Sequence, residues 1–184
     1  MKITAALSTS PAAPFTLQEL ELDEPRRDEV LVQIHATGLC HTDLTFKSQV
    51  PIPAVLGHEG AGIVTAVGEA VSGISPGDHV VLSYRSCGSC RSCAAGERAY
   101  CSRSMRLNSA GVRADGSPTL SDNGTPVYGS FFGQSSFAQY ALAGADNTVV
   151  VDPSIDLAVA APLGCGFQTD RKSTRLNSSH RIRS

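Results

Sequence analysis

The sequence has no tryptophan and only 5% aromatic residues, and it has no run of the roughly 18 apolar residues that a membrane-spanning helix needs. The first ten residues hold one lysine and too short an apolar stretch for a secretory signal, so we expect a cytoplasmic protein with no membrane partner. Few aromatics, combined with 17 glycines and 10 prolines, indicate strands and turns rather than a helical bundle.

Acidic side chains outnumber basic ones over most of the chain. The formal net charge is -2, but residues 170–184 hold five of the 15 basic residues and one of the 17 acidic ones. The first 169 residues therefore carry 10 basic and 16 acidic groups, a balance of -6. A body of this charge has no electrostatic reason to bind nucleic acid, so we expect no such partner.

The last fifteen residues, DRKSTRLNSSHRIRS, differ abruptly in composition from the rest. They include two apolar residues and show no periodicity. We interpret residues 170–184 as a non-native basic tail that resembles translated adapter sequence, and residues 1–169 as one incomplete domain. The alternative is a natural disordered tail that binds anions.

Hydrophobic patterning predicts a series of short elements. Strands are expected at residues 3–7, 15–22, 30–36, 57–67, 79–84, 137–142 and 148–151. We expect a helical turn at 42–47 and a short helix at 155–161 that Ser154 caps. Residues 102–127 are polar and irregular, and no regular element is predicted there.

Four cysteines follow one another at short spacing, as Cys87-x2-Cys90-x2-Cys93-x7-Cys101. Four thiolates in one compact loop can close a tetrahedral shell around Zn²⁺, which is typical of a structural site. An iron–sulfur cluster takes the same donors, and a zinc ribbon that binds protein or nucleic acid has similar spacing. Disulfides are disfavoured by the spacing and by a reducing compartment.

The other two cysteines, Cys40 and Cys165, lie far apart, and His58 and Glu59 lie between them. Two thiolates and one imidazole leave the fourth position of a zinc ion open for water or substrate, as in a catalytic site. Spacing alone does not show that these residues converge. If they do not, His58 is a packed histidine and Cys40 a small buried hydrophobe.

Four motifs occur in an order and at separations that resemble those of zinc-dependent medium-chain alcohol dehydrogenases. They are GLCHTDL at 38–44, GHEGAGIV at 57–64, the four-cysteine lobe at 87–101 and PLGCGFQT at 162–169. The chain looks most like the bacterial aryl- or benzyl-alcohol dehydrogenases. The resemblance covers residues 1–169 and implies a mainly β fold with short helices, a GroES-like barrel catalytic domain that carries a four-cysteine zinc lobe.

The resemblance also implies two Zn²⁺ per chain and a set of residue roles. The structural zinc ligands would be Cys87, Cys90, Cys93 and Cys101, and the catalytic zinc ligands Cys40, His58 and Cys165. Further roles would be orientation of the ligating histidine by Asp43, an acid behind the catalytic zinc at Glu59, acceptance of the alcohol proton by Thr42, and contact with the cofactor pyrophosphate by His41. Thr45 departs from the pattern, because many relatives have a proton-relay histidine there.

The implied reaction is oxidation of a primary alcohol, with an aromatic alcohol as the narrower expectation, to an aldehyde. Zinc would lower the pKa of the alcohol, and hydride would pass to NAD or NADP. The chain has no G-x-G-x-x-G turn, so we expect the Rossmann cofactor domain to be missing and this chain alone to be inactive. The full-length enzyme would act on small-molecule alcohols and aldehydes as a homodimer or homotetramer.

Two other functions compete with this hypothesis. One is a stand-alone zinc-binding scaffold or partner-binding module without catalysis. The other is a reductase of quinones or enals from the same broad family, whose members normally lack the zinc ligands. The presence of Cys40, His58 and Cys165 disfavours the reductase.

Overall fold

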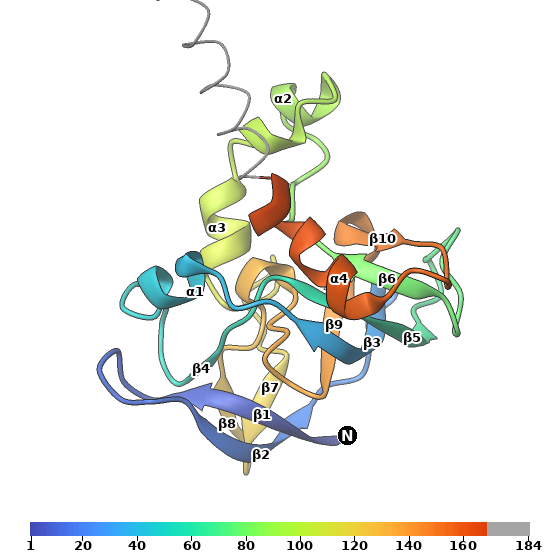
Figure 1. The fold of residues 1–184 in the computed structure, drawn as a ribbon. Coiled ribbons are helices and arrows are strands. Elements are labelled where there is room, and N and C mark those ends of the chain that lie inside the picture. Colours follow the sequence, from blue (N-terminus) through green and yellow to red (C-terminus); the bar gives the residue numbers. More distant parts are fainter. Residues whose placement is uncertain (169–184) are drawn as a thin grey trace, which may run out of the picture.

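Two five-stranded sheets form the body of the molecule (Figure 1). The structure is a computed structural model that describes residues 1–168. The first sheet contains, in spatial order, β4 (Ala54–Val55), β1 (Lys2–Ser8), β2 (Thr16–Leu22), β7 (Leu120–Asp122) and β8 (Thr125–Val127). The second contains β10 (Thr148–Val150), β6 (His79–Leu82), β5 (Gly60–Val67), β3 (Glu29–Thr37) and β9 (Tyr140–Gly144). All of these strand pairs are antiparallel.

The helices are short and lie outside the sheets (Figure 1). They are α1 (His41–Phe46), α2 (Arg91–Ala94), α3 (Ser104–Ser109) and α4 (Leu157–Ala160), together with the 3-10 turns η1 (Arg98–Tyr100), η2 (Phe131–Gly133), η3 (Ala145–Asn147) and η4 (Ala161–Gly164). In the part of the chain that the structure describes, every helix falls short of the length and apolarity needed to cross a bilayer. The prediction of a mainly β fold with short helices is confirmed.

Alternating apolar residues explain why the strands bury one face. On β1, Ile3, Ala5 and Leu7 are all at most 3% exposed, and they pack with residues of β2, β7 and β8. On β3, Val30 and Val32 are fully buried in a second cluster with β5 and β6. This two-residue period is the one that a half-buried strand requires.

Several predicted boundaries need correction. The strand predicted at 57–67 begins at Gly60, and the one predicted at 79–84 ends at Leu82. The strand predicted at 137–142 begins only at Tyr140, because Phe137 and Gln139 form isolated bonds across to β1 before the ladder with β3 starts. The helix near residue 155 starts at Leu157, and Asp156 rather than Ser154 is its N-cap, since the Asp156 carboxylate accepts a 2.8 Å bond from Ala158 N–H. The prediction of a tail at 170–184 lies outside the described residues.

The prediction of irregular structure at 102–127 is wrong in part. This stretch contains α3 and the β7–β8 hairpin. Asn123 and Gly124 form the tight turn of the hairpin, with φ of 47° and 80°. An Asn-Gly pair is the common sequence signal for such a turn, so the hairpin had a local signature despite its polar strands.

Candidate metal centres

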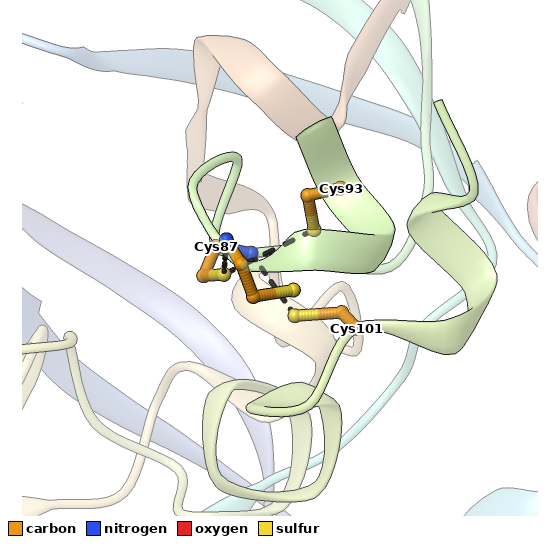
Figure 2. Close-up of side chains that lie close together, drawn as sticks. Cys87, Cys93 and Cys101 are labelled. Atoms are coloured by element: carbon orange, nitrogen blue, oxygen red, sulfur yellow. Dashed lines mark hydrogen bonds between the residues drawn. The ribbon is translucent and has the colours of Figure 1, made fainter. Parts of the chain in front are cut away.

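The four-cysteine lobe projects from one end of the body (Figure 1). It brings one sulfur atom from each of its cysteines within 4.8 Å of the other three. Figure 2 shows the sulfur atoms of Cys87, Cys93 and Cys101 turned toward one another, and the Cys87 and Cys93 sulfurs are 3.9 Å apart. A zinc–sulfur bond of about 2.3 Å places tetrahedral sulfurs about 3.8 Å apart. The spacing therefore fits one ion at the centre better than the larger cage of an iron–sulfur cluster.

Backbone N–H groups in the lobe favour thiolates. Cys90 N–H donates to the Cys87 sulfur at 3.3 Å, and Cys87 N–H donates to the Cys101 sulfur at 3.3 Å. Bonds from the Cys93 and Ser102 backbone lower the pKa of Cys90 to about 5, whereas burial raises the pKa of Cys93 to about 11. Four adjacent sulfurs cannot all be thiolates without a cation, so the donor set suits a divalent metal.

A second group forms where the end of β3 lies beside the start of β5. Thr37 pairs with Gly60, and Gly38 N–H donates to the Glu59 carbonyl at 3.0 Å. This pairing places the loop that leads to Cys40 beside the loop that holds His58 and Glu59. At the far end of the chain, the close approach of Gly164 to Leu82 on β6 brings Cys165 to the same place, because a β-carbon at Gly164 would lie 2.2 Å from the Leu82 carbonyl oxygen.

One ligand atom from each of Cys40, His58, Glu59 and Cys165 lies within 4.8 Å of the other three. The two cysteines are half-buried, whereas His58 and Glu59 are 1% and 4% exposed. Residues separated by more than a hundred positions therefore meet in one compact donor set.

Asp43 holds the imidazole of His58. Its Oδ1 is 2.9 Å from His58 Nδ1 and accepts a bond from Gly57 N–H, while its Oδ2 accepts one from Cys40 N–H at 3.0 Å. The other ring nitrogen, Nε2, is buried and has no hydrogen-bond partner among the described residues. A buried imidazole nitrogen that lies beside two sulfurs without a hydrogen bond is suited to bind a metal ion.

The charges around His58 also fit a cation. Burial lowers its pKa, but the hydrogen bond and attraction of Asp43 and the interaction with Cys165 outweigh burial and raise the pKa to about 10. Burial raises the pKa of Cys40, yet hydrogen bonds from Thr42 and the contact with His58 lower it overall. Without a metal the site therefore attracts a proton, the cation that a metal would replace.

The carboxylate of Glu59 is locked between two glycines. Its Oε1 accepts a 2.7 Å bond from Gly166 N–H. A β-carbon on Gly38 would lie 2.0 Å from its Oε2, and one on Gly166 would lie 2.9 Å from its Oε1. Both positions therefore need glycine for Glu59 to keep its place behind the other donors.

The remaining predicted site residues lie on or beside α1. Thr42 is half-buried and hydrogen-bonds to the Cys40 sulfur, so it belongs to the group. His41 is exposed at the start of α1, outside the group of donor atoms. Thr45 is also exposed, and its carbonyl accepts a bond from the Ser48 hydroxyl.

Sequence reasoning missed the aromatic wall of this site. The ring of Phe132 lies 4.7 Å from the His58 ring, and Phe131 meets His58 edge-on at 5.7 Å. Phe132 also helps to line an adjoining cavity of about 230 Å³, whose other walls include Phe46, Tyr84 and Met105. The cavity is mostly apolar, and a Phe-Phe pair before a predicted strand was its only visible signal.

Comparison with known proteins shows the family. The model of the alcohol dehydrogenase GroES-like domain matches residues 26–153. The chain belongs to this family. Its two sheets are the fold of this GroES-like domain. The described residues include no doubly wound parallel sheet of the kind that binds dinucleotides.

Curated relatives support the same assignment. The chain is 45% identical over 168 residues to geraniol dehydrogenase of Castellaniella defragrans, which covers 90% of this chain and 45% of that protein. It is 36% identical over 174 residues to S-(hydroxymethyl)glutathione dehydrogenase of Escherichia coli, covering 92% of this chain and 47% of that protein. The chain thus spans about half the length of the curated relatives it matches.

Solved structures agree in fold. The zinc-binding alcohol dehydrogenase domain protein of Burkholderia ambifaria superimposes with a TM-score of 0.89 at 50% identity, covering 92% of this chain and 47% of that one. Benzyl alcohol dehydrogenase of Acinetobacter calcoaceticus superimposes with a TM-score of 0.85 at 46% identity, covering 92% and 46%. Both similarities extend over nearly the whole of the present chain.

Proposed function

We propose that this chain forms the zinc-binding part of an enzyme that oxidises a primary alcohol to an aldehyde with NAD or NADP. The observation that carries the proposal is the donor set of Cys40, His58 and Cys165, which has an unpartnered His58 Nε2 and an adjoining apolar cavity. Three protein donors leave one position for an alcohol. The four cysteines of the lobe would hold a second, structural zinc ion.

The residues around the first metal would divide the work. Bound zinc would make the alcohol more acidic and polarise the aldehyde carbonyl. The Thr42 hydroxyl, which lies beside the Cys40 sulfur, is placed to take the alcohol proton. Asp43 keeps the imidazole of His58 oriented, and Phe132 covers the face of that ring and excludes water. Glu59 would supply a further carboxylate close to the zinc, next to the three ligands.

The apolar cavity indicates the kind of alcohol. Phe46, Tyr84 and Phe132 offer ring faces and edges, and Met105 offers a polarisable thioether. Such walls suit a flat unsaturated group next to the reacting carbon. Two similar proteins are named for geraniol and benzyl alcohol, which both have that feature. We therefore favour an aromatic primary alcohol as the substrate.

Several wider features belong to the same proposal. Residues 1–169 would be one GroES-like unit, and 170–184 a non-native tail. The exposed His41 would meet the cofactor pyrophosphate. The whole enzyme would be a cytoplasmic homodimer or homotetramer, and the present chain alone would bind zinc without transferring hydride.

The test uses the whole protein that contains this chain. It should reduce NAD⁺ or NADP⁺ when benzyl alcohol is added, as followed by the absorbance of the reduced cofactor. Cys40→Ala and Cys165→Ala should each abolish the reaction, because each removes one thiolate of the donor set. A folded, zinc-loaded protein that neither binds the cofactor nor oxidises alcohols would instead favour a zinc-binding scaffold.

A further inference from the structure

Gln134 is a fully buried carboxamide that follows η2 and lies against the backbone of the His58 loop. Its exposed fraction is 0%. The side-chain nitrogen Nε2 donates to the His58 carbonyl at 2.9 Å and to the Ser83 carbonyl at 3.2 Å. The side-chain oxygen Oε1 accepts a 3.0 Å bond from Gly60 N–H. Every strong hydrogen-bonding direction of the amide N–H₂ is therefore used.

Two of these bonds enclose a single residue. The His58 carbonyl and the Gly60 N–H belong to the peptide groups on either side of Glu59, so Gln134 clamps the backbone that carries both Glu59 and His58. The third peptide contact of this loop, from Gly38 N–H to the Glu59 carbonyl, comes from the loop that leads to Cys40. Ser136 N–H donates to the Gly57 carbonyl at 3.0 Å, so Gln134 and its neighbour together hold the loop that leads into β5.

The segment around Gln134 also grips the imidazole itself. Phe131 and Phe132, just before Gln134, contact the His58 ring at 5.7 Å and 4.7 Å between centroids. Phe132 and Ser135 have φ of 50° and 52°, a left-handed conformation that side chains other than glycine rarely adopt. Such conformations persist where surrounding contacts enforce them, and they cluster at functional sites.

We propose that Gln134 is a positioning residue of the Cys40–His58–Cys165 metal site, holding His58 and Glu59 at their places through the two peptide groups that flank Glu59. The proposal rests on the proposed metal site but not on the alcohol reaction. It makes Gln134 distinct from a residue that only stabilises the fold, because its loss changes the geometry of one metal site and leaves the other unaffected.

Asn147 provides a matched control. It is also a buried amide with three bonds: its Nδ2 donates to the Ser83 and Gly133 carbonyls, and its Oδ1 accepts from Gly144 N–H. Gln134 and Asn147 therefore share one acceptor, Ser83, and bear the same number of bonds. They differ in their other partners, because the Asn147 side chain bonds to Gly133 and Gly144 where Gln134 bonds to His58 and Gly60.

The experiment is a Co²⁺ titration of the full chain against a chromophoric chelator, with absorption spectra of the cobalt–thiolate bands. A Cys40→Ser chain supplies the spectrum of the four-cysteine site alone. Gln134→Met keeps the side-chain length but removes all three bonds. We expect it to lower Co²⁺ affinity at the Cys40–His58–Cys165 site about tenfold and to shift the bands of that site, with the four-cysteine bands unchanged.

Gln134→Glu is a second variant that keeps an acceptor for Gly60 N–H but sets an oxygen against the His58 and Ser83 carbonyls, and circular dichroism shows whether each variant is folded. Gln134→Glu should shift the same bands in the same site. Asn147→Leu should lower the melting temperature of the chain about as much as Gln134→Met does, but it should not move the bands of the Cys40–His58–Cys165 site. Wild-type bands and affinity in both Gln134 variants, or an equal change in Asn147→Leu, would overturn the proposal. If the Gln134 variants show altered bands but the wild-type whole enzyme does not oxidise alcohols, the positioning role stands and only the proposed reaction is overturned.

Discussion

His58 Nδ1 lies 2.9 Å from Asp43 Oδ1, and both side chains are completely shielded from solvent. This contact fixes the ring so that its second nitrogen points at the Cys40 and Cys165 sulfurs. The same carboxylate accepts bonds from the backbone of Cys40 and Gly57, so it ties the two ligand-bearing loops together.

Replacing that carboxylate should weaken metal binding at one site. An amide at position 43 cannot accept all three bonds with the same strength, so the Asp43→Asn chain should bind Zn²⁺ at the Cys40–His58–Cys165 site about 10–100-fold more weakly. Competition with a chromophoric chelator measures the affinity. Asp152→Asn, an exposed carboxylate that accepts bonds from Ser154, is the control and should bind normally. Equal affinities in the two variants would show that Asp43 does not orient the imidazole.

Metal removal should unfold the four-cysteine lobe and spare the sheets. Within residues 87–101 the side chains that are buried are those of Cys93 and Cys101, so the lobe has no apolar core other than its own ligands. A chelator should therefore raise amide hydrogen exchange across this lobe while β1 and β3 stay protected. Protection of the lobe that persists after complete metal removal would mean that its loop is held by other contacts.

The buried guanidinium of Arg113 should be a major source of stability. Its Nε and Nη2 meet the two carboxylate oxygens of Glu29 at 2.7 Å and 3.0 Å, and Nη1 meets Asp23 at 2.9 Å. Arg113→Met leaves the largely buried Glu29 without its partner, which costs roughly 3–5 kcal/mol of unfolding free energy. Urea denaturation measures the loss. Arg26→Met breaks only an exposed pair with Asp115 and should cost about 0–1 kcal/mol. A similar, small loss in both variants would refute the distinction.

A methyl group at Gly38 should disturb Glu59 directly. The added carbon would lie 2.0 Å from Glu59 Oε2, so Gly38→Ala should destabilise the chain by about 1–3 kcal/mol. Removing the Glu59 carboxylate as well should restore much of the lost unfolding free energy, because the two substitutions act on one contact. The Gly38→Ala/Glu59→Ala double variant should therefore be less unstable than the two single losses added together. Strict additivity in thermal unfolding would place the clash elsewhere.

Much of the fold was predictable from the local hydrophobic pattern, and the elements that were not predicted were missed for physical reasons. The alternation of Ile3, Ala5 and Leu7, and of Val30 and Val32, predicted β1 and β3 because each strand buries one face. The β7–β8 hairpin was missed because its strands are three residues each and polar, although Asn123-Gly124 marked its turn. Short strands carry too few residues to establish a period.

The site divides in the same way. Its seven metal-ligand candidates were visible as residue types, and the structure brings them together in the two groups that the motifs predicted, while their role as ligands stays a prediction. Spacing did not predict that Cys165 meets Cys40, because that contact depends on the pairing of β3 with β5 and on the close packing of Gly164 against β6. Phe132 and Gln134 were missed because their roles depend on a left-handed turn at η2, for which neither residue is a sequence signal.

Two separate zinc sites with different donors in one chain should be visible in the zinc stoichiometry, which native mass spectrometry measures. The wild-type chain should carry two zinc ions. Cys40→Ala should carry one ion, held by the four cysteines, and Cys93→Ala should carry one ion, held by Cys40, His58 and Cys165. A folded wild-type chain with a single zinc ion, or a Cys40→Ala chain that still carries two, would show that these residues do not form two separate zinc sites.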